Sequence, residues 1–306
     1  MGYDQRLPAD SNVYTHARAL SLHPAFELIG GVDGNTDRRS EFASTFKVES
    51  YASIAETPAD ANPDVVTIAV PTAAHAGVIA DVLKRWKPKA ILCEKPLAYS
   101  LDEARHIVDL CQKSGSQLYV NYMRLSDPGV LEIRRRLDVG EIKTPTKGVV
   151  WYSKGLLNNG SHFFGLLEYW LGEMLGFDVV DKGRLMGDDC EPDFVARFQK
   201  GAAYFLAARE EDFSHYTIEL MSPSGRIRYE QGGERIVWQS AAASERVVDY
   251  AVLQPEEQLI ANDLGRYQWH VLEQMNRSLN NEAASICTGK SALRTLEYLT
   301  EIRNAL

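Results

Sequence analysis

Short apolar runs alternate with amphipathic stretches along the first part of the chain. The runs that we expect to form strands are residues 26–32, 65–70, 91–93 and 117–120. Stretches with helical spacing lie at residues 13–22, 37–46, 73–86 and 101–114. Strands that alternate with helices of this length build βαβ units. The pattern therefore predicts an α/β domain with a doubly wound parallel sheet over residues 1–122.

The pattern changes after Asn121. A helix is expected from about Pro128, and a long strand from Thr146 to Tyr152. Period-2 alternation predicts further strands at residues 194–199, 202–208, 215–221 and 225–229. Helical patterns close the chain at residues 265–279 and 291–304. Closely spaced strands joined by turn residues form antiparallel sheets. We therefore expect an α+β second domain over residues 123–306, with an antiparallel sheet and closing helices.

The strand at residues 91–93 ends abruptly in Glu94, Lys95 and Pro96. The carboxyl ends of parallel strands face the ligand crevice of an open α/β sheet, so a lysine at this point is directed toward a substrate. The alternative is a solvated lysine at a strand end. Glu94 favours the functional interpretation, because its carboxylate can hold the ammonium group or contact a cofactor. Pro96 restricts the residue before it and fixes the direction in which the chain leaves the strand.

A second strand end is expected at the same crevice. Pro71 follows the run at residues 65–70, where a proline cannot extend the sheet. Thr72 is well placed as a helix N-cap, and this structural role is an alternative to a role in binding. His75 lies in the same turn and is interpreted either as a packing or capping residue or as a ligand contact.

Asp33 follows the run at residues 26–32. Its structural interpretation is an Asx turn with Gly34 and Asn35. In a dinucleotide-binding fold, an acid at this point hydrogen-bonds the adenosine ribose hydroxyls and repels a 2′-phosphate, which favours NAD over NADP. Arg38 or Arg39 could instead pair with that phosphate.

The densest group of polar residues runs from Tyr152 to His162 and leads into an apolar helix. Asn159 or Ser161 could simply cap that helix. His162 falls in its first turn, four residues after Asn158, where the ring could reach the crevice. Histidine is the side chain best matched to proton transfer near neutral pH, so we favour catalysis over packing.

Composition narrows the classes of protein. The chain has 45% hydrophobic residues and a formal net charge of −9, which argues against disorder and against a nucleic acid partner. Four cysteines lack metal-ligand spacing, so we expect a reducing compartment and no metal site. No apolar stretch approaches the roughly 20 residues that span a bilayer. The expected location is the cytoplasm, with no membrane partner.

Together these motifs resemble the glucose-fructose oxidoreductase and inositol dehydrogenase family, Gfo/Idh/MocA. The resemblance covers nearly the whole chain in order. The residues that carry it are Asp33, Pro71-Thr72-x-x-His75, Glu94-Lys95-Pro96, Val120-Asn121-Tyr122-x-Arg124 and Asn158-x-x-x-His162. It implies an N-terminal Rossmann domain, a C-terminal open antiparallel sheet for substrate and oligomer contacts, and nicotinamide-dependent oxidation or reduction of a sugar or polyol. A homo-oligomer, dimer or tetramer, is expected.

The resemblance also implies roles for individual residues. Lys95 would orient and polarise the reacting hydroxyl or carbonyl, and His162 would exchange its proton. Asn158 stands where many relatives have an aspartate, and an amide can position the histidine but cannot stabilise an imidazolium as a carboxylate would. Asp33, Pro71, Thr72, His75 and Glu94 would contact the cofactor. The expected substrate residues are Asn121, Tyr122, Arg124, Tyr152, Lys154, Asn159 and His162, and the cations would suit an acidic or nucleotide-linked sugar.

This chain departs from the family pattern at its front. The family begins with an apolar strand and a Gly-x-Gly-x-x-Gly turn that cradles a pyrophosphate. Neither is found before the first expected helix. Losing that central strand forfeits about 5–10 kcal/mol of apolar burial. We therefore expect either that the natural protein begins upstream of Met1 or that something else fills the slot. The first hypothesis is an NAD-dependent dehydrogenase; the alternative is a silent relative that binds sugar or supports assembly without a dinucleotide.

Overall fold

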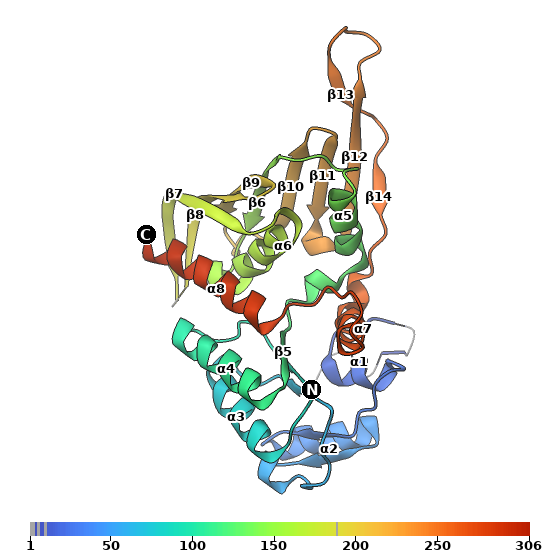
Figure 1. Ribbon diagram of the computed structural model, residues 1–306, viewed down its shortest axis with the longest axis vertical. Coiled ribbons are helices and arrows are strands. Elements are labelled where there is room, and N and C mark those ends of the chain that lie inside the picture. Colours follow the sequence, from blue (N-terminus) through green and yellow to red (C-terminus); the bar gives the residue numbers. More distant parts are fainter. Residues whose placement is uncertain (1–3, 5–6, 9–10, 188) are drawn as a thin grey trace. The chain divides into compact units, whose positions relative to one another are not determined.

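The computed structural model describes residues 4, 7–8, 11–187 and 189–306 (Figure 1). The chain divides into two compact units. The first unit ends at Ser126, and the chain returns to it over Gly265–Leu293. Asp127–Leu264 and Arg294–Leu306 form the second unit. This differs from the expectation that residues 123–306 form one domain. The physical reason is a helix near the C-terminus that buries its apolar face in the first unit.

The first unit is an α/β unit, and the strands named among its described residues pair in parallel. Its elements are α1 (His16–Leu22), β1 (Gly30–Val32), α2 (Thr36–Phe46), β2 (Glu49–Tyr51), η1 (Ile54–Glu56), β3 (Val65–Ile68), η2 (Thr72–Ala74), α3 (His75–Arg85), β4 (Ala90–Cys93), α4 (Leu101–Ser114), β5 (Gln117–Val120), η3 (Met123–Ser126), η6 (Leu264–Arg266, at the second boundary) and α7 (Tyr267–Leu279). The α/β prediction is confirmed. The short strand β2 was not expected, because its three residues carry no apolar alternation.

The parallel strands form two sheets, β1–β2 and β3–β4–β5. Among the described residues, β1 pairs only with β2, and β3 pairs only with β4. In the 3-2-1-4-5-6 order, the first strand of the family pattern lies between the two strands that correspond here to β1 and β3. Beside the open edge of β1, Ile29 is 50% exposed and Val32 is 46% exposed. Among the described residues, the expected single sheet is therefore divided into two sheets, and the division lies where the family pattern has its first strand.

The core of the first unit surrounds β4, whose four residues are all buried. Leu92 and Ala90 pack with Tyr119 of β5, and with Val271, Leu272 and Met275 of α7. Helix α4 begins where the hydroxyl of Ser100 accepts the N–H of Glu103 at 3.3 Å, and it ends at Gly115 with φ +79°. This packing fixes the strand that ends in Glu94 and Lys95.

The second unit is built on one large sheet with helices on one face. Its elements are α5 (Pro128–Asp138), β6 (Thr146–Tyr152), η4 (Gly155–Gly160), α6 (Ser161–Leu171), β7 (Met174–Met186), β8 (Asp189–Phe198), β9 (Gly201–Ala207), β10 (Tyr216–Ser222), β11 (Gly225–Glu230), η5 (Gln231–Gly233), β12 (Arg235–Ala243), β13 (Ala251–Leu253) and β14 (Gln258–Ile260), and most of α8 (Gly289–Asn304). The strand order is β13-β12-β11-β10-β6-β9-β8-β7, with β14 beside β12.

This sheet is mixed, whereas an antiparallel sheet was expected. The pair β6–β9 is parallel, because α6 and the β7–β8 hairpin intervene before the chain returns beside β6. Strands β7, β12, β13 and β14 were not expected. In β7 most side chains are at least partly exposed, so the strand lacks the alternation by which strands are recognised.

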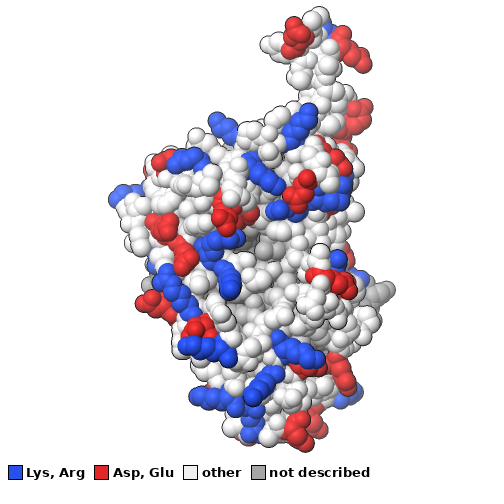
Figure 2. Space-filling view, in the orientation of Figure 1, with Lys and Arg blue, Asp and Glu red and all other residues white. Residues whose placement is uncertain are grey.

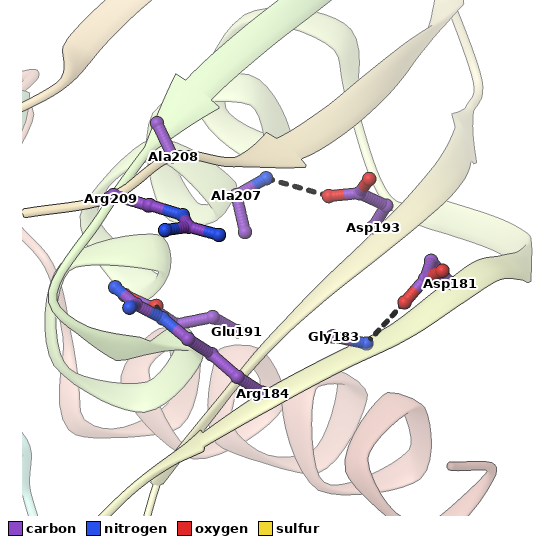
Figure 3. Close-up of a pocket in the computed structure, with 8 residues that line it drawn as sticks. All are labelled: Asp181, Gly183, Arg184, Glu191, Asp193, Ala207, Ala208 and Arg209. Carbon is purple, nitrogen blue, oxygen red and sulfur yellow. Dashed lines mark hydrogen bonds and ion pairs between the residues drawn. The ribbon is translucent and has the colours of Figure 1, made fainter.

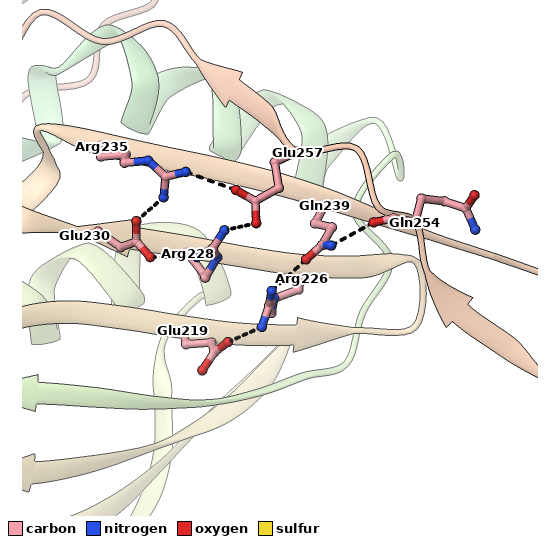
Figure 4. Close-up of polar contacts among 8 residues, drawn as sticks. All are labelled: Glu219, Arg226, Arg228, Glu230, Arg235, Gln239, Gln254 and Glu257. Carbon is pink, nitrogen blue, oxygen red and sulfur yellow. Dashed lines mark hydrogen bonds and ion pairs between the residues drawn. The ribbon is translucent and has the colours of Figure 1, made fainter.

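The inner face of the sheet is apolar, and the outer face carries both polar and exposed apolar side chains. Inward residues such as Phe205, Ile218 and Ile227 are buried. The outer face carries a network in which Arg226, Arg228 and Arg235 are paired with glutamates and Gln239 bonds the backbone of Gln254 (Figure 4). The β12–β13 hairpin projects from this sheet (Figure 1).

Charges of both signs are mixed over the surface shown in Figure 2. No helix among the described residues combines the length and hydropathy that crossing a membrane requires. Within the same part of the chain, no group of His, Cys, Asp and Glu side chains is arranged to hold a metal ion. All four cysteines are free and buried.

Candidate functional site

Lys95 is the second residue after β4, at the carboxyl end of the parallel sheet, where the sequence placed it. The pKa of its ammonium group is lowered, because burial disfavours the charged form. The carboxylate of Glu94 raises that pKa, but less than burial lowers it. The guanidinium of Arg124 lowers the pKa further. The surroundings of Lys95 are therefore those of a partly desolvated ammonium group.

Glu94 is held by three donors within the first unit. Its Oε1 lies 2.6 Å from Nε2 of His16 and accepts the side-chain amide of Asn121 at 2.8 Å. Its Oε2 accepts the backbone N–H of Lys95 at 3.3 Å. Burial alone would raise the pKa of Glu94, but these donors outweigh burial and lower it. Glu94 is thus a fixed carboxylate beside Lys95.

Sequence reasoning missed His16. It is the first residue of α1, and its side chain is 15% exposed. The available signal was its place at the start of a helix next to an expected ligand crevice, where helix N-termini commonly point. The sequence gave no means of pairing it with Glu94, 78 residues away.

Asp33 forms the expected Asx turn, since its Oδ1 accepts the N–H of Asn35 at 2.8 Å. Its side chain remains 34% exposed after β1, and a guanidinium nitrogen of Arg38 lies 3.8 Å from its Oδ2. Arg39 donates to the backbone carbonyl of Asp33 at 2.8 Å. The turn therefore presents one carboxylate oxygen beside a cation, so the structural and binding interpretations are compatible.

The alternative interpretation of Thr72, as the N-cap of α3, is wrong. The N-cap is Ala74, without a side-chain bond, because Pro71 and Thr72 start the short helix η2 first. His75 is fully buried, and its two ring nitrogens lie 3.0 Å and 3.1 Å from the carbonyls of Leu97 and Val70. These bonds favour packing over the predicted cofactor contact for His75.

Asn121 and Tyr122 follow β5 and are both buried, while Arg124 lies in η3 and is partly exposed. The Oδ1 atom of Asn121 is buried and has no hydrogen-bond partner among the described residues. This atom is an acceptor that a ligand amide or hydroxyl could satisfy.

In the second unit, Tyr152 does not fit the predicted substrate contact. It is fully buried, and its hydroxyl donates to the carbonyl of Pro192 at 2.6 Å. Burial raises the pKa of this phenol. Lys154 lies 2.8 Å from Glu210, which raises the pKa of the lysine through their hydrogen bond. Its charge is thus already paired.

Asn158 and Asn159 lie in the π-helical turn η4, which runs directly into α6. Asn158 is exposed, and the side-chain amide of Asn159 donates to the hydroxyl of Tyr216 at 3.0 Å. Neither Asn159 nor Ser161 caps α6, because the N-cap position is Gly160. His162 lies in the first turn of α6, as expected, and is 8% exposed.

A cavity of about 250 Å³ lies among β7, β8 and β9 (Figure 3). Arg184, Arg209, Glu191 and Asp193 line it, together with Asp181, Gly183, Ala207 and Ala208. Arg184 is bonded to Glu191 and Glu211. None of the predicted site residues lines this cavity, so the cavity does not mark the predicted site.

Comparison with known proteins places the chain among oxidoreductases. Residues 12–122 match the model of the Gfo/Idh/MocA family, described as an oxidoreductase family with an NAD-binding Rossmann fold. Scyllo-inositol 2-dehydrogenase (NAD(+)) of Bacillus subtilis (strain 168) is 31% identical over 240 residues, which is 70% of this chain and 69% of that protein. The chain belongs to the Gfo/Idh/MocA family. D-apiose dehydrogenase of Paraburkholderia graminis is 26% identical over 53% of this chain, and the match spans 44% of that relative.

Solved structures share the fold of this family member. An NAD binding oxidoreductase from Klebsiella pneumoniae has a TM-score of 0.78 at 13% identity, with 94% of this chain and 92% of that chain covered. The WlbA dehydrogenase from Bordetella pertussis, in complex with NADH and UDP-GlcNAcA, has a TM-score of 0.72 at 16% identity, with 94% and 90% covered.

NAD is the cofactor of the family, and the residues of this chain fit part of it. Asp33 fits a ribose, and the unpartnered Oδ1 of Asn121 fits a ligand donor near Lys95. At the start of α1, the buried carboxylate of Asp4 accepts the N–H and hydroxyl of the N-cap residue Thr15 at 2.9 Å and 2.7 Å. The described residues contain no Gly-x-Gly-x-x-Gly turn, so we assign no pyrophosphate contact to them.

Proposed function

We propose that this chain is an NAD-dependent dehydrogenase that oxidises a hydroxyl of a sugar or polyol, or reduces the matching carbonyl. The observation that carries the proposal is Lys95 at the carboxyl end of β4, beside a carboxylate held by His16 and Asn121. This arrangement belongs to a unit with the NAD-binding fold of an oxidoreductase family. The similarity to scyllo-inositol 2-dehydrogenase covers a larger share of the chain than either unit alone.

The proposed chemistry divides between a hydride and a proton. Bound NAD+ supplies the acceptor for the hydride that leaves the carbinol carbon. Lys95 donates a hydrogen bond to the hydroxyl oxygen, which stabilises the negative charge that develops as its proton leaves. The imidazole of His162 takes that proton, and in the reverse direction it returns the proton to the carbonyl oxygen. Asn158 is proposed to orient the reacting groups, because its amide carries no charge to stabilise an imidazolium.

The same proposal assigns the remaining contacts. Asp33, Pro71, Thr72 and Glu94 are proposed to contact the cofactor, and Asn121, Tyr122, Arg124 and Asn159 the substrate. Because Glu210 already pairs with Lys154, this lysine gives less support to an acidic sugar than the sequence suggested. Relatives named for inositol and for D-apiose support a neutral polyol or sugar. We therefore propose a neutral polyhydroxy substrate first.

Turnover tests the proposal. The purified chain is mixed with NAD+ and scyllo-inositol, D-apiose or UDP-N-acetylglucosamine, and NADH formation is followed by absorbance. We expect turnover with at least one of them, and its loss in Lys95→Ala and His162→Ala while the fold is retained. Lys89→Ala, at the opposite end of β4 and 70% exposed, is the matched control. Near-normal kcat in either active-site variant would refute the assigned role.

Calorimetry with NAD+ separates this function from the alternative, a relative that binds sugar or supports assembly. A folded chain that binds no NAD+ at millimolar concentration would favour that alternative. A cytoplasmic location and a homo-oligomer remain proposals of the same kind. The exposed Trp151, Tyr204 and Met221 on the outer face of the sheet support a contact between copies. Light scattering of the purified chain would give its mass in solution and test the oligomer.

A further inference from the structure

The turn η4 begins with backbone N–H groups that its own helix cannot satisfy. The first N–H groups of any helix lack intrahelical partners and must be bonded elsewhere. Here the acceptors are two carboxylates of strand β8. Asp189 accepts the N–H of Leu157 at 3.0 Å and that of Asn158 at 3.1 Å through its Oδ2. Glu191 accepts the N–H of Gly155 at 3.1 Å.

These carboxylates are themselves fixed. The side chain of Glu191 is 1% exposed and bonds Nε of Arg184 at 2.6 Å. Asp189 Oδ1 accepts the N–H of Cys190 at 2.8 Å, so its carboxylate is tied to β8 as well as to the turn. Negative charge at this end of a helix is also favoured by the helix dipole. The strand therefore provides a rigid anchor for the start of η4.

Glycine allows the close approach. Gly155 has φ +86°, and a Cβ added there would lie 2.1 Å from Oδ2 of Asp189. Any other residue would push the carboxylate away or distort the turn. The sequence around η4 is thus matched to a carboxylate that arrives from a strand more than thirty positions later.

The anchored turn carries the proposed catalytic groups. Asn158 donates its backbone N–H directly to Asp189, and its carbonyl accepts the hydroxyl of Ser161 at 2.9 Å. Ser161 is the first residue of α6, and His162 is the second. A chain of bonded groups therefore runs from Asp189 to the first turn of the helix that holds His162.

We propose that Asp189 is a positioning residue that sets the placement of Asn158 and His162. This inference rests on the proposed function, in which His162 exchanges the substrate proton. Asp189 touches neither substrate nor cofactor in this proposal and acts only through the backbone of η4. A shift of about 1 Å in a catalytic group can reduce the rate by about a hundredfold. Loss of the anchor is therefore expected to reduce kcat rather than NAD+ affinity, since the NAD-binding fold lies in the other unit.

The test compares Asp189→Ala, Asp189→Asn and Asp193→Ala. Asp193 is the matched control, because it lies on β8 and accepts the backbone N–H of Ala207 at 2.7 Å, but it holds β9 instead of η4. The asparagine variant keeps one oxygen acceptor for the turn. Thermal unfolding of each variant shows that it is folded at the temperature of measurement.

The first readout does not require turnover. The imidazole signals of isotope-labelled histidine are recorded by NMR, and His162→Gln identifies the signal of His162 among the seven histidines. We expect this signal to shift or broaden in Asp189→Ala, to return toward its wild-type position in Asp189→Asn, and to stay unchanged in Asp193→Ala. A wild-type His162 signal in Asp189→Ala would overturn the proposal. An equal change in Asp193→Ala would also overturn it, because the effect would then be general.

The second readout is kinetic, with NAD+ and the substrate that turns over. We expect Asp189→Ala to lower kcat by about 10- to 100-fold with the KM for NAD+ unchanged, and Asp193→Ala to stay within about threefold of wild type. An unchanged kcat would refute the positioning role. If wild type turns over none of the probes, the proposed function fails, and the NMR result still decides whether Asp189 positions His162.

Discussion

Replacing His16 with alanine tests whether the start of α1 holds the carboxylate beside Lys95. In the structure Nε2 of His16 lies 2.6 Å from Oε1 of Glu94, and the two side chains are 15% and 32% exposed. His16→Ala removes one of the three donors to Glu94 and leaves those from Asn121 and the backbone of Lys95.

The magnitude follows from the partners that remain. A hydrogen bond to a charged group contributes about 1.5–3 kcal/mol when it is buried. Because Glu94 keeps other donors and some contact with water, we expect His16→Ala to lower the free energy of unfolding by about 1–2 kcal/mol at pH 7. The lowered pKa of Glu94 should also rise toward its unfolded value.

The pH dependence has a defined sign. Glu94 has a lower pKa in the folded state, so its contribution to stability is present above the unfolded pKa, about 4.3, and is lost as the pH falls through the folded value. The difference between wild type and His16→Ala should therefore be present at pH 7 and shrink below about pH 4.

The assay is urea unfolding of wild type, His16→Ala and the control His106→Ala across that pH range. His106 is an exposed histidine on α4, and its replacement should change the free energy of unfolding by less than about 0.5 kcal/mol. Equal destabilisation by the two variants would refute the reasoning. So would a difference between wild type and His16→Ala that persists unchanged in acid.

Two further predictions concern the preference for a cofactor and the packing of α7 into the core of the first unit. Asp33→Ala should weaken NAD+ binding and reduce the preference for NAD+ over NADP+, because the carboxylate that would bind ribose and repel a 2′-phosphate is removed; calorimetry with both dinucleotides measures this, and an unchanged ratio would contradict the role. Leu272→Ala in α7 should lower the free energy of unfolding by about 2–5 kcal/mol, since Leu272 is 1% exposed in the core of the first unit. The control Leu259→Ala, 66% exposed on β14, should change it by less than about 0.5 kcal/mol in the same urea titration.

Local patterns predicted the elements that bury one face. Helix α4 and strand β5 have the expected bounds, because amphipathic spacing, a serine cap and a terminal glycine all point to the same ends. Strand β7 was not recognised, since few of its side chains are buried. The parallel pairing of β6 with β9 also escaped prediction, because strand direction depends on the path of α6 and the β7–β8 hairpin.

The candidate site shows the same division. Sequence placed Lys95, Asp33 and His162 at the ends or starts of elements, because their neighbours fix those ends. The sequence could not show that the hydroxyl of Tyr152 donates to the carbonyl of Pro192, or that the ring nitrogens of His75 bond two carbonyls, because these partners come from other segments.

The sequence by itself determined the family, the alternation of strands and helices, and the residues proposed for proton transfer and cofactor contact. These properties depend on local spacing and on motifs that remain contiguous along the chain. The tertiary structure decided that α7 completes the first unit, that His16 holds Glu94, and that Asp189 anchors the turn before His162. Each of these contacts joins residues distant in the chain, and only packing of the folded backbone brings such groups within hydrogen-bond distance.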